Sequence, residues 1–387
     1  MTHQFMRAML AAVAMTACAI QPSEPGARNA DVIYVVGESA AIFVVDPGAG
    51  RVLAQPSAPS ELKLSPVLSN DSSTLFFTKY DAESAIYSLT APVFTLQRWL
   101  DLQPPADAPT GTLWISGFEL AFAPGHDELF GYGAVVRDTA YPANERCCLV
   151  EFDTVSRSVR GSIGLGGFSG LTALPPGPVV PNGGLVALIS SRYDPAILTW
   201  IAVVDPSTRT VIDSLAVPMP NTGAIEEAQS LVVAPGGRRI YILGWFGVYG
   251  YDLLTRQLIG IVNTSASGLD FDPHLALSPD GGRAYLTTVF EPPYGTPRPP
   301  TTVRVFDENL VEQEPIALVH QFGARTPIFH DMLVSRDGAS LYFLAGNRDF
   351  FGEGEDRIMV LNLRSREVTR VIPLGVYAQA RLLLGHL

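Results

Sequence analysis

The sequence predicts an all-β fold in which seven four-stranded antiparallel sheets close into a ring. Three observations predict it: a strand–turn–strand phrase with seven copies, a second phrase with six copies, and a lone apolar segment at the carboxyl end. A period of roughly 40–60 residues built from short strands is typical of rings or stacks of small sheets, because each repeat buries its faces against its neighbours.

The first phrase is an apolar run that ends on Asp or a substitute, followed by a turn and a second apolar run. We expect it to form the third and fourth strands, C and D, of each sheet. Asp, Asn, Pro and Gly supply the side-chain hydrogen bonds and positive φ angles that short turns need. Thr90 departs from the pattern in the second copy. The copies begin at Phe43, Ile86, Val150, Ala202, Tyr249, Val303 and Met359.

The second phrase is an apolar run, a tight polar turn and another apolar run, and we expect it to form strands A and B. Strands A to C are nearly continuous apolar runs, which is typical of sheets covered on both faces. Strand D is mixed in character, which is typical of an outer edge that meets water. The copies begin at Val67, Leu120, Val179, Leu231, Leu275 and Leu333.

The first sheet has no strand A of its own, because it starts at Asp31 with a B-like strand. The apolar segment Ala380–Leu387 matches this gap. We therefore expect residues 31–55 and 376–387 to form one sheet, so that residues 31–387 make one closed ring. Closure hides edge strands that would otherwise pair with other chains.

These repeats resemble those of a known family. Ile33–Val36 (IYVV), Ser278–Leu286 (SPDGGRAYL) and Val203–Leu215 (VVDPSTRTVIDSL) look like the YVTN-type repeats of seven-bladed bacterial β-propellers. The wider clan includes lactonase-like and quinoprotein-dehydrogenase-like propellers. The resemblance covers Asp31 to the end of the chain and implies the fold, whereas the Pro-rich stretch Leu174–Pro181 departs from it.

The amino terminus is typical of an export signal. Arg7 precedes a ten-residue apolar stretch, Ala8–Ala17, which is too short to span a bilayer. Met15–Cys18 (MTAC) resembles a bacterial lipobox with Cys18 as the lipidated residue, while cleavage after Ala19 is the alternative. Residues 1–18 are thus expected to be a signal and residues 19–30 a flexible tether. We expect an exported protein on the periplasmic or outer-surface side of a bacterial membrane.

The charge of the chain limits its partners. A net charge of −12 argues against nucleic acid, because phosphate binding needs a basic surface. It also argues against a face held by anionic lipids, so we expect membrane contact only through the lipid on Cys18. The expected protein is a monomer whose partner is a protein or another cell-envelope ligand.

One face of the predicted ring carries long connections between strands B and C and between strands D and A. Binding residues concentrate on long loops held by a rigid scaffold, so we expect this looped face to be the working face. Neutral drift of surface loops is the alternative. The long connections are Pro104–Thr112, Arg137–Arg146, Pro218–Ala228, Glu291–Thr302, His320–Thr326 and Asn347–Asp356.

Alignment of the A–B turns places polar residues together at the mouth of the central channel. Imidazole and carboxylate groups there could bind a divalent metal or act as acid and base, although no spacing matches a known metal motif. The alternative is a water-filled mouth whose groups bond one another. The turn alignment equates Ser65, Glu119, Pro176, Ser230, His274 and Asp331. The candidate ligand residues are Glu119, Gln229, Asp272, His274, His330 and Asp331.

Cys147 and Cys148 are adjacent, and thiols outside the cytoplasm tend to be oxidised. A disulfide between neighbours on a strand needs a distorted peptide, because their side chains point to opposite faces. Two unpaired thiols are the alternative.

The sequence favours a non-catalytic binding or scaffolding protein that uses the looped face and needs no cofactor. The alternative is a lactonase-like or quinoprotein-dehydrogenase-like enzyme with a ligand or metal at the channel mouth.

Overall fold

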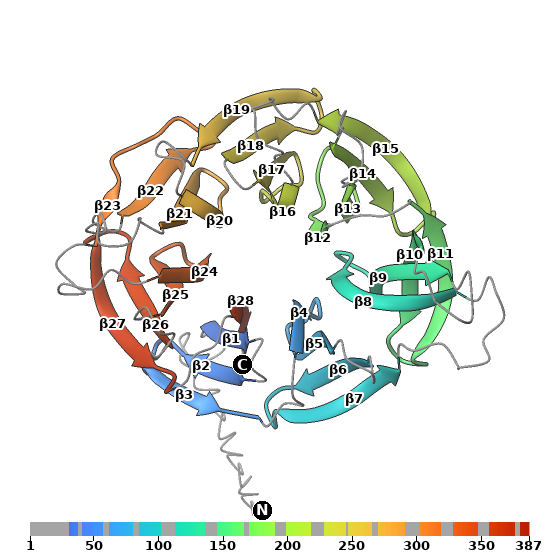
Figure 1. Cartoon of the computed structure of the whole chain (residues 1–387), viewed down its shortest axis with the longest axis horizontal. Coiled ribbons are helices and arrows are strands. Elements are labelled where there is room, and N and C mark those ends of the chain that lie inside the picture. Colours follow the sequence, from blue (N-terminus) through green and yellow to red (C-terminus); the bar gives the residue numbers. More distant parts are fainter. Residues whose placement is uncertain are drawn as a thin grey trace, which may run out of the picture.

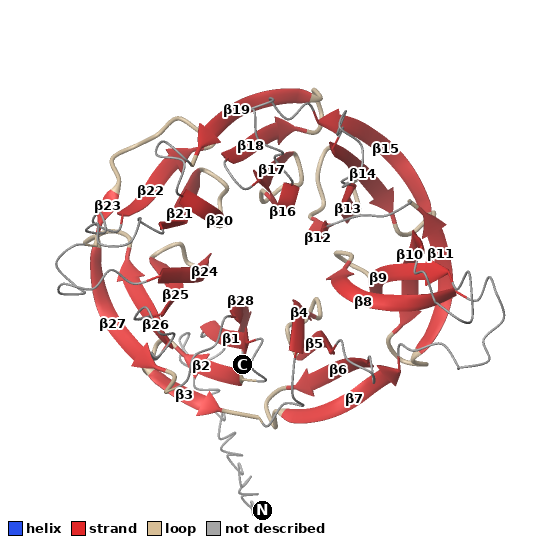
Figure 2. Ribbon diagram, viewed as in Figure 1, coloured by secondary structure: helices blue, strands red, loops and turns tan. Residues whose placement is uncertain are grey.

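The computed structural model is a ring of seven sheets around a central axis (Figures 1 and 2). Each sheet has four antiparallel strands, and the chain visits the sheets in order around the ring. The predicted all-β seven-bladed propeller is therefore confirmed. The structure describes residues 31–37, 41–56, 62–79, 85–101, 113–135, 145–165, 170–189, 199–217, 228–244, 247–264, 270–290, 302–318, 328–346, 356–375 and 380–386.

The blades are numbered from the amino end, and their strands are given from the innermost outward. Blade 1 holds β28 (Ala380–His386), β1 (Asp31–Gly37), β2 (Ile42–Asp46) and β3 (Arg51–Ala54). Blade 2 holds β4 (Leu62–Leu68), β5 (Thr74–Lys79), β6 (Ala85–Thr90) and β7 (Thr95–Asp101). Blade 3 holds β8 (Leu113–Phe122), β9 (Glu128–Val135), β10 (Glu145–Asp153) and β11 (Ser158–Gly164). Blade 4 holds β12 (Gly170–Leu174), β13 (Gly184–Ile189), β14 (Thr199–Asp205) and β15 (Thr210–Val217).

The remaining three blades repeat this order. Blade 5 holds β16 (Ala228–Val233), β17 (Arg239–Gly244), β18 (Gly247–Asp252) and β19 (Gln257–Asn263). Blade 6 holds β20 (Asp270–Leu277), β21 (Arg283–Phe290), β22 (Thr302–Asp307) and the two-residue β23 (Ile316–Ala317). Blade 7 holds β24 (Ile328–Val334), β25 (Ser340–Gly346), β26 (Asp356–Asn362) and β27 (Glu367–Pro373).

The ring is closed by the carboxyl-terminal strand, as predicted. β28 pairs along its whole length with β1, from Asp31 opposite His386 to Gly37 opposite Ala380. One end of the chain therefore supplies the innermost strand of blade 1, and the other end supplies the remaining three strands. This pairing covers the inner edge of β1 and leaves no unpaired edge there.

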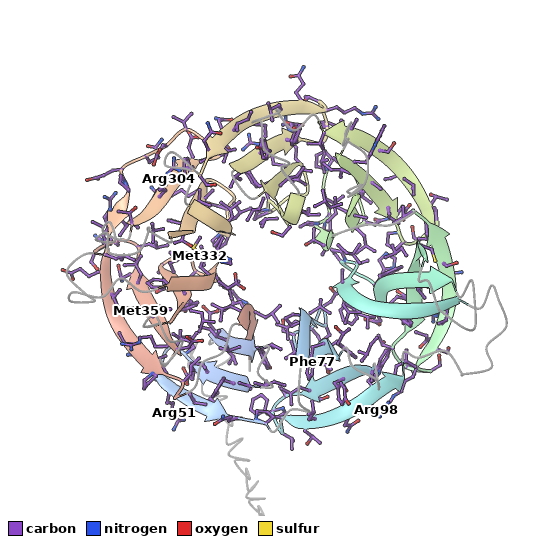
Figure 3. All side chains as sticks on the ribbon, in the orientation of Figure 1. Arg51, Phe77, Arg98, Arg304, Met332 and Met359 are labelled. Atoms are coloured by element: carbon purple, nitrogen blue, oxygen red, sulfur yellow. The ribbon has the colours of Figure 1, made fainter. Side chains whose placement is uncertain are left out.

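The apolar core lies between neighbouring blades and is divided into seven clusters, one at each blade-to-blade contact. In Figure 3, Phe77 and Met359 lie within the body of the ring, whereas Arg51 and Arg98 lie at its outer rim. Strands of the inner and middle layers, such as β18, are buried throughout, while outer strands such as β27 are mostly exposed. Each sheet is thus covered on both faces by its neighbours, which explains the continuous apolar runs.

The turns between strands C and D share one design in six of the seven blades, blade 2 being the exception. The Asp or Asn at the end of strand C accepts backbone N–H bonds within the turn, for example from Val155 and Ser156 to Asp153 Oδ1, both at 2.8 Å. These bonds, that of Ser156 first, lower the pKa of Asp153. Equivalent bonds reach Asp46, Asp205, Asp252, Asp307 and Asn362. The last turn residue has positive φ, and these residues are Gly50, Phe94, Arg157, Arg209, Arg256, Leu310 and Arg366.

The expected strand A of blade 4 was wrong. The Val179 copy placed it at Val179–Val180, but these residues lie in the connection between β12 and β13. The actual strand is Gly170–Leu174, which pairs in regular register with β13. Pro176 consequently lies in the A–B turn and not at the channel mouth. The Pro-rich turn is long and buries Val180, so Val179 and Val180 form an apolar pair that resembles the start of a strand in the sequence.

Four buried tyrosines make the stability of the ring decrease at alkaline pH. Burial raises the pKa of Tyr34, Tyr241, Tyr251 and Tyr342 above 10, and that of Tyr251 to about 12. The folded state thus holds these protons more tightly than the unfolded chain does. The associated stabilisation is complete below pH 10 and is lost as the pH rises from 10 to about 12.

We expect the free energy of unfolding, measured by urea titration, to fall across this alkaline window. Tyr251 alone contributes about 2–3 kcal/mol of the fall, from its shift of about two pKa units. A stability that stays constant from pH 10 to about 12 would contradict this expectation.

Candidate functional site

The backbone places the predicted mouth residues at a shared irregularity of the innermost strands. Within the described part of the ring, β4, β8, β16, β20 and β24 each have a register shift before the second half of the strand. Glu119, Gln229, Asp272 and His330 lie within these shifts, and Ser65 occupies the one in blade 2. Bulges change the direction in which side chains are presented and often occur beside functional sites. The side chains of these residues lie outside the described part of the structure.

Two of the six candidate ligand residues, Asp331 and His274, have described side chains, and both lie within the packing of the ring. Asp331 Oδ2 accepts the N–H of Leu382 at 2.8 Å, and its Oδ1 accepts the N–H of Met332 at 2.9 Å. The first bond ties blade 7 to the closing strand β28. His274 is only 7% exposed and lies opposite Thr287 in the ladder between β20 and β21. Asp331 therefore connects two blades, and all six candidate ligand residues stay predictions.

Among the described residues, neither a metal-binding cluster nor a membrane-spanning helix is found. Within them, no group of three or more His, Cys, Asp or Glu side chains is arranged to hold a metal ion. The described residues also include no helix long and apolar enough to cross a membrane.

Cys148 is disulfide-bonded and 5% exposed. The pairing of β10 with β9 skips from Arg146 to Cys148, so Cys147 is the extra residue of a bulge. A bulge supplies the backbone distortion that a bond between neighbouring cysteines requires. The side chain of Cys147 lies outside the described residues, so the pairing of Cys147 with Cys148 stays a prediction. The long connections of the looped face also lie largely outside them.

The opposite face, which carries the A–B and C–D turns, is described in detail. On this face, the positive-φ residue of each C–D turn lies at the contact with the preceding blade. Arg209 donates to Glu151 of blade 3 from Nε at 2.6 Å and from Nη2 at 2.9 Å. Arg256 pairs with Asp213 of blade 4 at 2.5 Å, and Arg366 pairs with Glu314 of blade 6 at 2.6 Å.

Other groups fill the equivalent place at three further contacts. Phe94 packs into the apolar cluster between blades 1 and 2, and Leu310 into that between blades 5 and 6. Between blades 7 and 1, where the turn residue is Gly50, the Arg370 guanidinium donates to the carbonyl oxygens of Pro47 and Gly48. Six of the seven contacts are thus filled on this face. Ion pairs fill three of them, apolar side chains fill two, and an arginine bonded to backbone carbonyl oxygens fills one.

The contact between blades 2 and 3 is the exception. Arg157 occupies the turn position, but among the described residues its guanidinium has no ion pair and no hydrogen-bond acceptor. The residue of blade 2 that corresponds to Glu151 is Ser88, two positions before the end of strand C. Thr90, the departure seen in the sequence, ends that strand in place of Asp.

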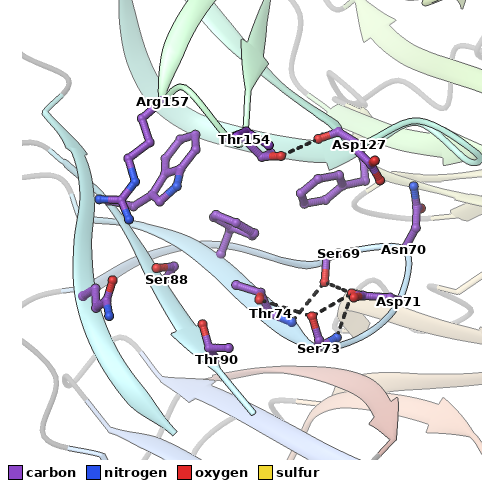
Figure 4. Close-up of a pocket in the computed structure, with 15 residues that line it drawn as sticks. Ser69, Asn70, Asp71, Ser73, Thr74, Ser88, Thr90, Asp127, Thr154 and Arg157 are labelled. Atoms are coloured by element: carbon purple, nitrogen blue, oxygen red, sulfur yellow. Dashed lines mark hydrogen bonds between the residues drawn. The ribbon is translucent and has the colours of Figure 1, made fainter.

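A pocket of about 630 Å³ opens at this contact (Figure 4). Its floor belongs to the aromatic cluster between the two blades, where Phe76 meets Trp99 edge-on at 5.3 Å and Phe122 at 5.5 Å. Polar side chains form the rim. The lining consists of Ser69, Asn70, Asp71, Ser73, Thr74, Phe76, Ser88, Thr90, Gln97, Trp99, Phe122, Asp127, Thr154, Val155 and Arg157.

The charges of the pocket lie at opposite ends. Figure 4 shows Arg157 at one end, extended toward Ser88, and Asp71 at the other. Asp71 Oδ1 accepts the hydroxyl of Ser69 at 2.6 Å and the N–H of Ser73 at 3.0 Å. These bonds lower the pKa of Asp71, which therefore stays ionised at neutral pH. The pocket thus combines an apolar floor, a cation at one end and a carboxylate at the other.

Sequence reasoning did not find this pocket, although the signal was present. Alignment of the C strands sets Ser88 against Glu151 and Thr90 against Asp153. Ser88 therefore lacks the carboxylate with which Glu151 binds Arg209 at the next contact.

Comparisons with known proteins agree with the fold. No family model matches the sequence, and no curated protein matches it. The dihydro-heme d1 dehydrogenase NirN in complex with DHE is similar in structure, with 14% identity, a TM-score of 0.56, and 95% of this chain and 78% of that chain covered. A functionally unknown protein from Desulfotomaculum acetoxidans DSM 771 shows 12% identity, a TM-score of 0.55, and 92% and 99% coverage.

Apo AztD from Citrobacter koseri is similar over the same shares of the two chains, at 11% identity with a TM-score of 0.54. At such low identity these likenesses show the fold alone. Fold and neighbours together define the chain as a seven-bladed β-propeller protein.

Proposed function

We propose that this propeller is an exported, non-catalytic binding protein, and that the pocket between blades 2 and 3 is one of its binding sites. The observation that carries the proposal is the open contact at Arg157, because the corresponding place is filled at the other six contacts. A pocket of about 630 Å³ with an apolar floor and a few polar groups has the size and character of a small-molecule site.

Export and anchoring form part of this proposal and rest on the sequence. The apolar stretch Ala8–Ala17 and the Met15–Cys18 motif support a signal followed by lipidation of Cys18. The looped face is then free to engage a protein or another envelope ligand. The mass of the mature amino terminus distinguishes a lipidated Cys18 from cleavage after Ala19.

The enzyme alternative is supported by one observation, the register shifts that the innermost strands share at Glu119, Gln229, Asp272 and His330. The dihydro-heme d1 dehydrogenase NirN is similar in fold, which supports the dehydrogenase form of this alternative.

Crystallographic screening of small organic fragments tests both possibilities. The proposal predicts that fragments gather between blades 2 and 3, against Phe76 and Trp99. A cluster of fragments at the channel mouth, with none between blades 2 and 3, would instead support the enzyme alternative and count against the binding pocket. The contact between blades 3 and 4, which the Arg209–Glu151 pair fills, is the internal control and should stay empty.

A further inference from the structure

We propose that the pocket between blades 2 and 3 binds a small organic carboxylate with an apolar body, and that Arg157 is the residue that recognises the carboxylate. This inference rests on the proposed binding function and specifies the ligand class of that site. Three other blades carry an arginine at the same turn position, and these arginines can be compared with Arg157.

The turn arginines show what this position binds. Arg209, Arg256 and Arg366 each hold a carboxylate of the preceding blade, at 2.6, 2.5 and 2.6 Å. The geometry of the turn therefore directs a guanidinium toward an acceptor on the neighbouring blade. Guanidinium groups match carboxylates in shape and can bind them through two parallel hydrogen bonds.

Blade 2 supplies no such acceptor to Arg157 among its described residues. Where Glu151 lies in blade 3, blade 2 has Ser88, which lies near the guanidinium in Figure 4. Gln97, opposite Ser88 in the ladder between β6 and β7, and Thr90 also line the pocket. These hydroxyl and amide groups can donate to a second carboxylate oxygen. A ligand carboxylate would thus complete the interaction that the protein itself makes at the contacts of Arg209, Arg256 and Arg366.

The rest of the pocket suits an apolar body. Trp99 is 6% exposed, and Phe76 and Phe122 are each 5% exposed, so the floor is apolar and held rigid by aromatic packing. Asp71 and Asp127 at the far end disfavour a second negative charge there. The ligand is therefore expected to carry one carboxylate, and it can carry a hydrogen-bond donor at its other end.

Isothermal titration with two probes of the same shape tests this inference. Phenylacetate carries the carboxylate, and phenylacetamide is its neutral counterpart. We expect phenylacetate to bind at least about tenfold more tightly, which is the effect of one hydrogen-bonded charge pair. Arg157→Gln should abolish the difference, whereas Arg366→Gln, the same turn position in blade 7, should preserve it. Arg157 is exposed, so its replacement should leave the fold intact.

A second variant adds the missing acceptor. Ser88→Glu places a carboxylate at the position that Glu151 has in blade 3, so it should pair with Arg157 and prevent phenylacetate from binding. Equal affinity for the two probes, or a preference that survives Arg157→Gln, overturns the inference and leaves the binding function standing. Phenylacetate affinity that Ser88→Glu leaves unchanged also overturns it. If neither probe binds the pocket, the proposed binding function fails with it.

Discussion

Deletion of residues 380–387 is expected to abolish cooperative folding. The deletion removes β28, exposes the inner edge of β1 along all seven paired residues, and takes Leu382 out of the apolar cluster between blades 7 and 1. It also leaves Asp331 without the Leu382 N–H that it accepts at 2.8 Å. Together these losses should lower the free energy of unfolding by more than about 5 kcal/mol, which is comparable to the whole stability of many domains. Circular dichroism during urea titration and size-exclusion chromatography measure the effect.

A circular permutant is the matched control for this deletion. The last paired residue, His386, lies opposite Asp31, so a short turn can join residue 387 to residue 31. Residues 380–387 placed before Asp31 should then restore cooperative unfolding, because β28 keeps its place in the sheet. A truncated chain that unfolds at the urea concentration of the full chain would contradict the role of β28.

The second large effect is expected at Gly237, in the A–B turn of blade 5. Gly237 has a φ of +64°, and a Cβ added there would lie 2.3 Å from the carbonyl oxygen of Pro175 in blade 4. Because the obstacle is backbone, it cannot rotate away. Gly237→Ala should lower the free energy of unfolding by about 3–5 kcal/mol, through overpacking and an unfavourable φ together.

Gly236 provides the control for this substitution. Its φ is +84°, but a Cβ there would meet nothing within 4 Å. Gly236→Ala should therefore cost only the strain of the left-handed conformation, about 1–2 kcal/mol. Urea titration of the two variants isolates the close approach of the two turns. Equal losses of stability would show that the contact between blades 4 and 5 is looser than the structure indicates.

The architecture could be predicted because it is encoded locally and repeatedly. Asp153 and Asp205 end strand C and organise the turn by side-chain hydrogen bonds, so each blade can be recognised from a few residues. The gap in blade 1 matched the segment Ala380–Leu387, which made closure predictable. Blade 4 was harder, because Val179 and Val180 in its long turn have the apolar character of a strand.

The binding pocket could not be predicted from any single residue. Thr90 departs from the Asp of the repeat, and this departure is visible in the sequence. Its connection with a pocket depends on Arg157, which belongs to the next blade and lies more than sixty residues later in the chain. Pairings across blades require the ring to be built first. At the channel mouth, the sequence placed Glu119 and Asp331 at equivalent points but gave no sign of the bulges in β8 and β24, which set where side chains point.

A crystal structure of the protein grown with phenylacetate tests the central claim most directly, namely that the contact between blades 2 and 3 is left open to receive a carboxylate. The expected result is the phenylacetate carboxylate within hydrogen-bonding distance of the Arg157 guanidinium, with the ring of the ligand against Trp99. Phenylacetate elsewhere on the ring, or an Arg157 guanidinium already paired with an acidic side chain of blade 2, would contradict it.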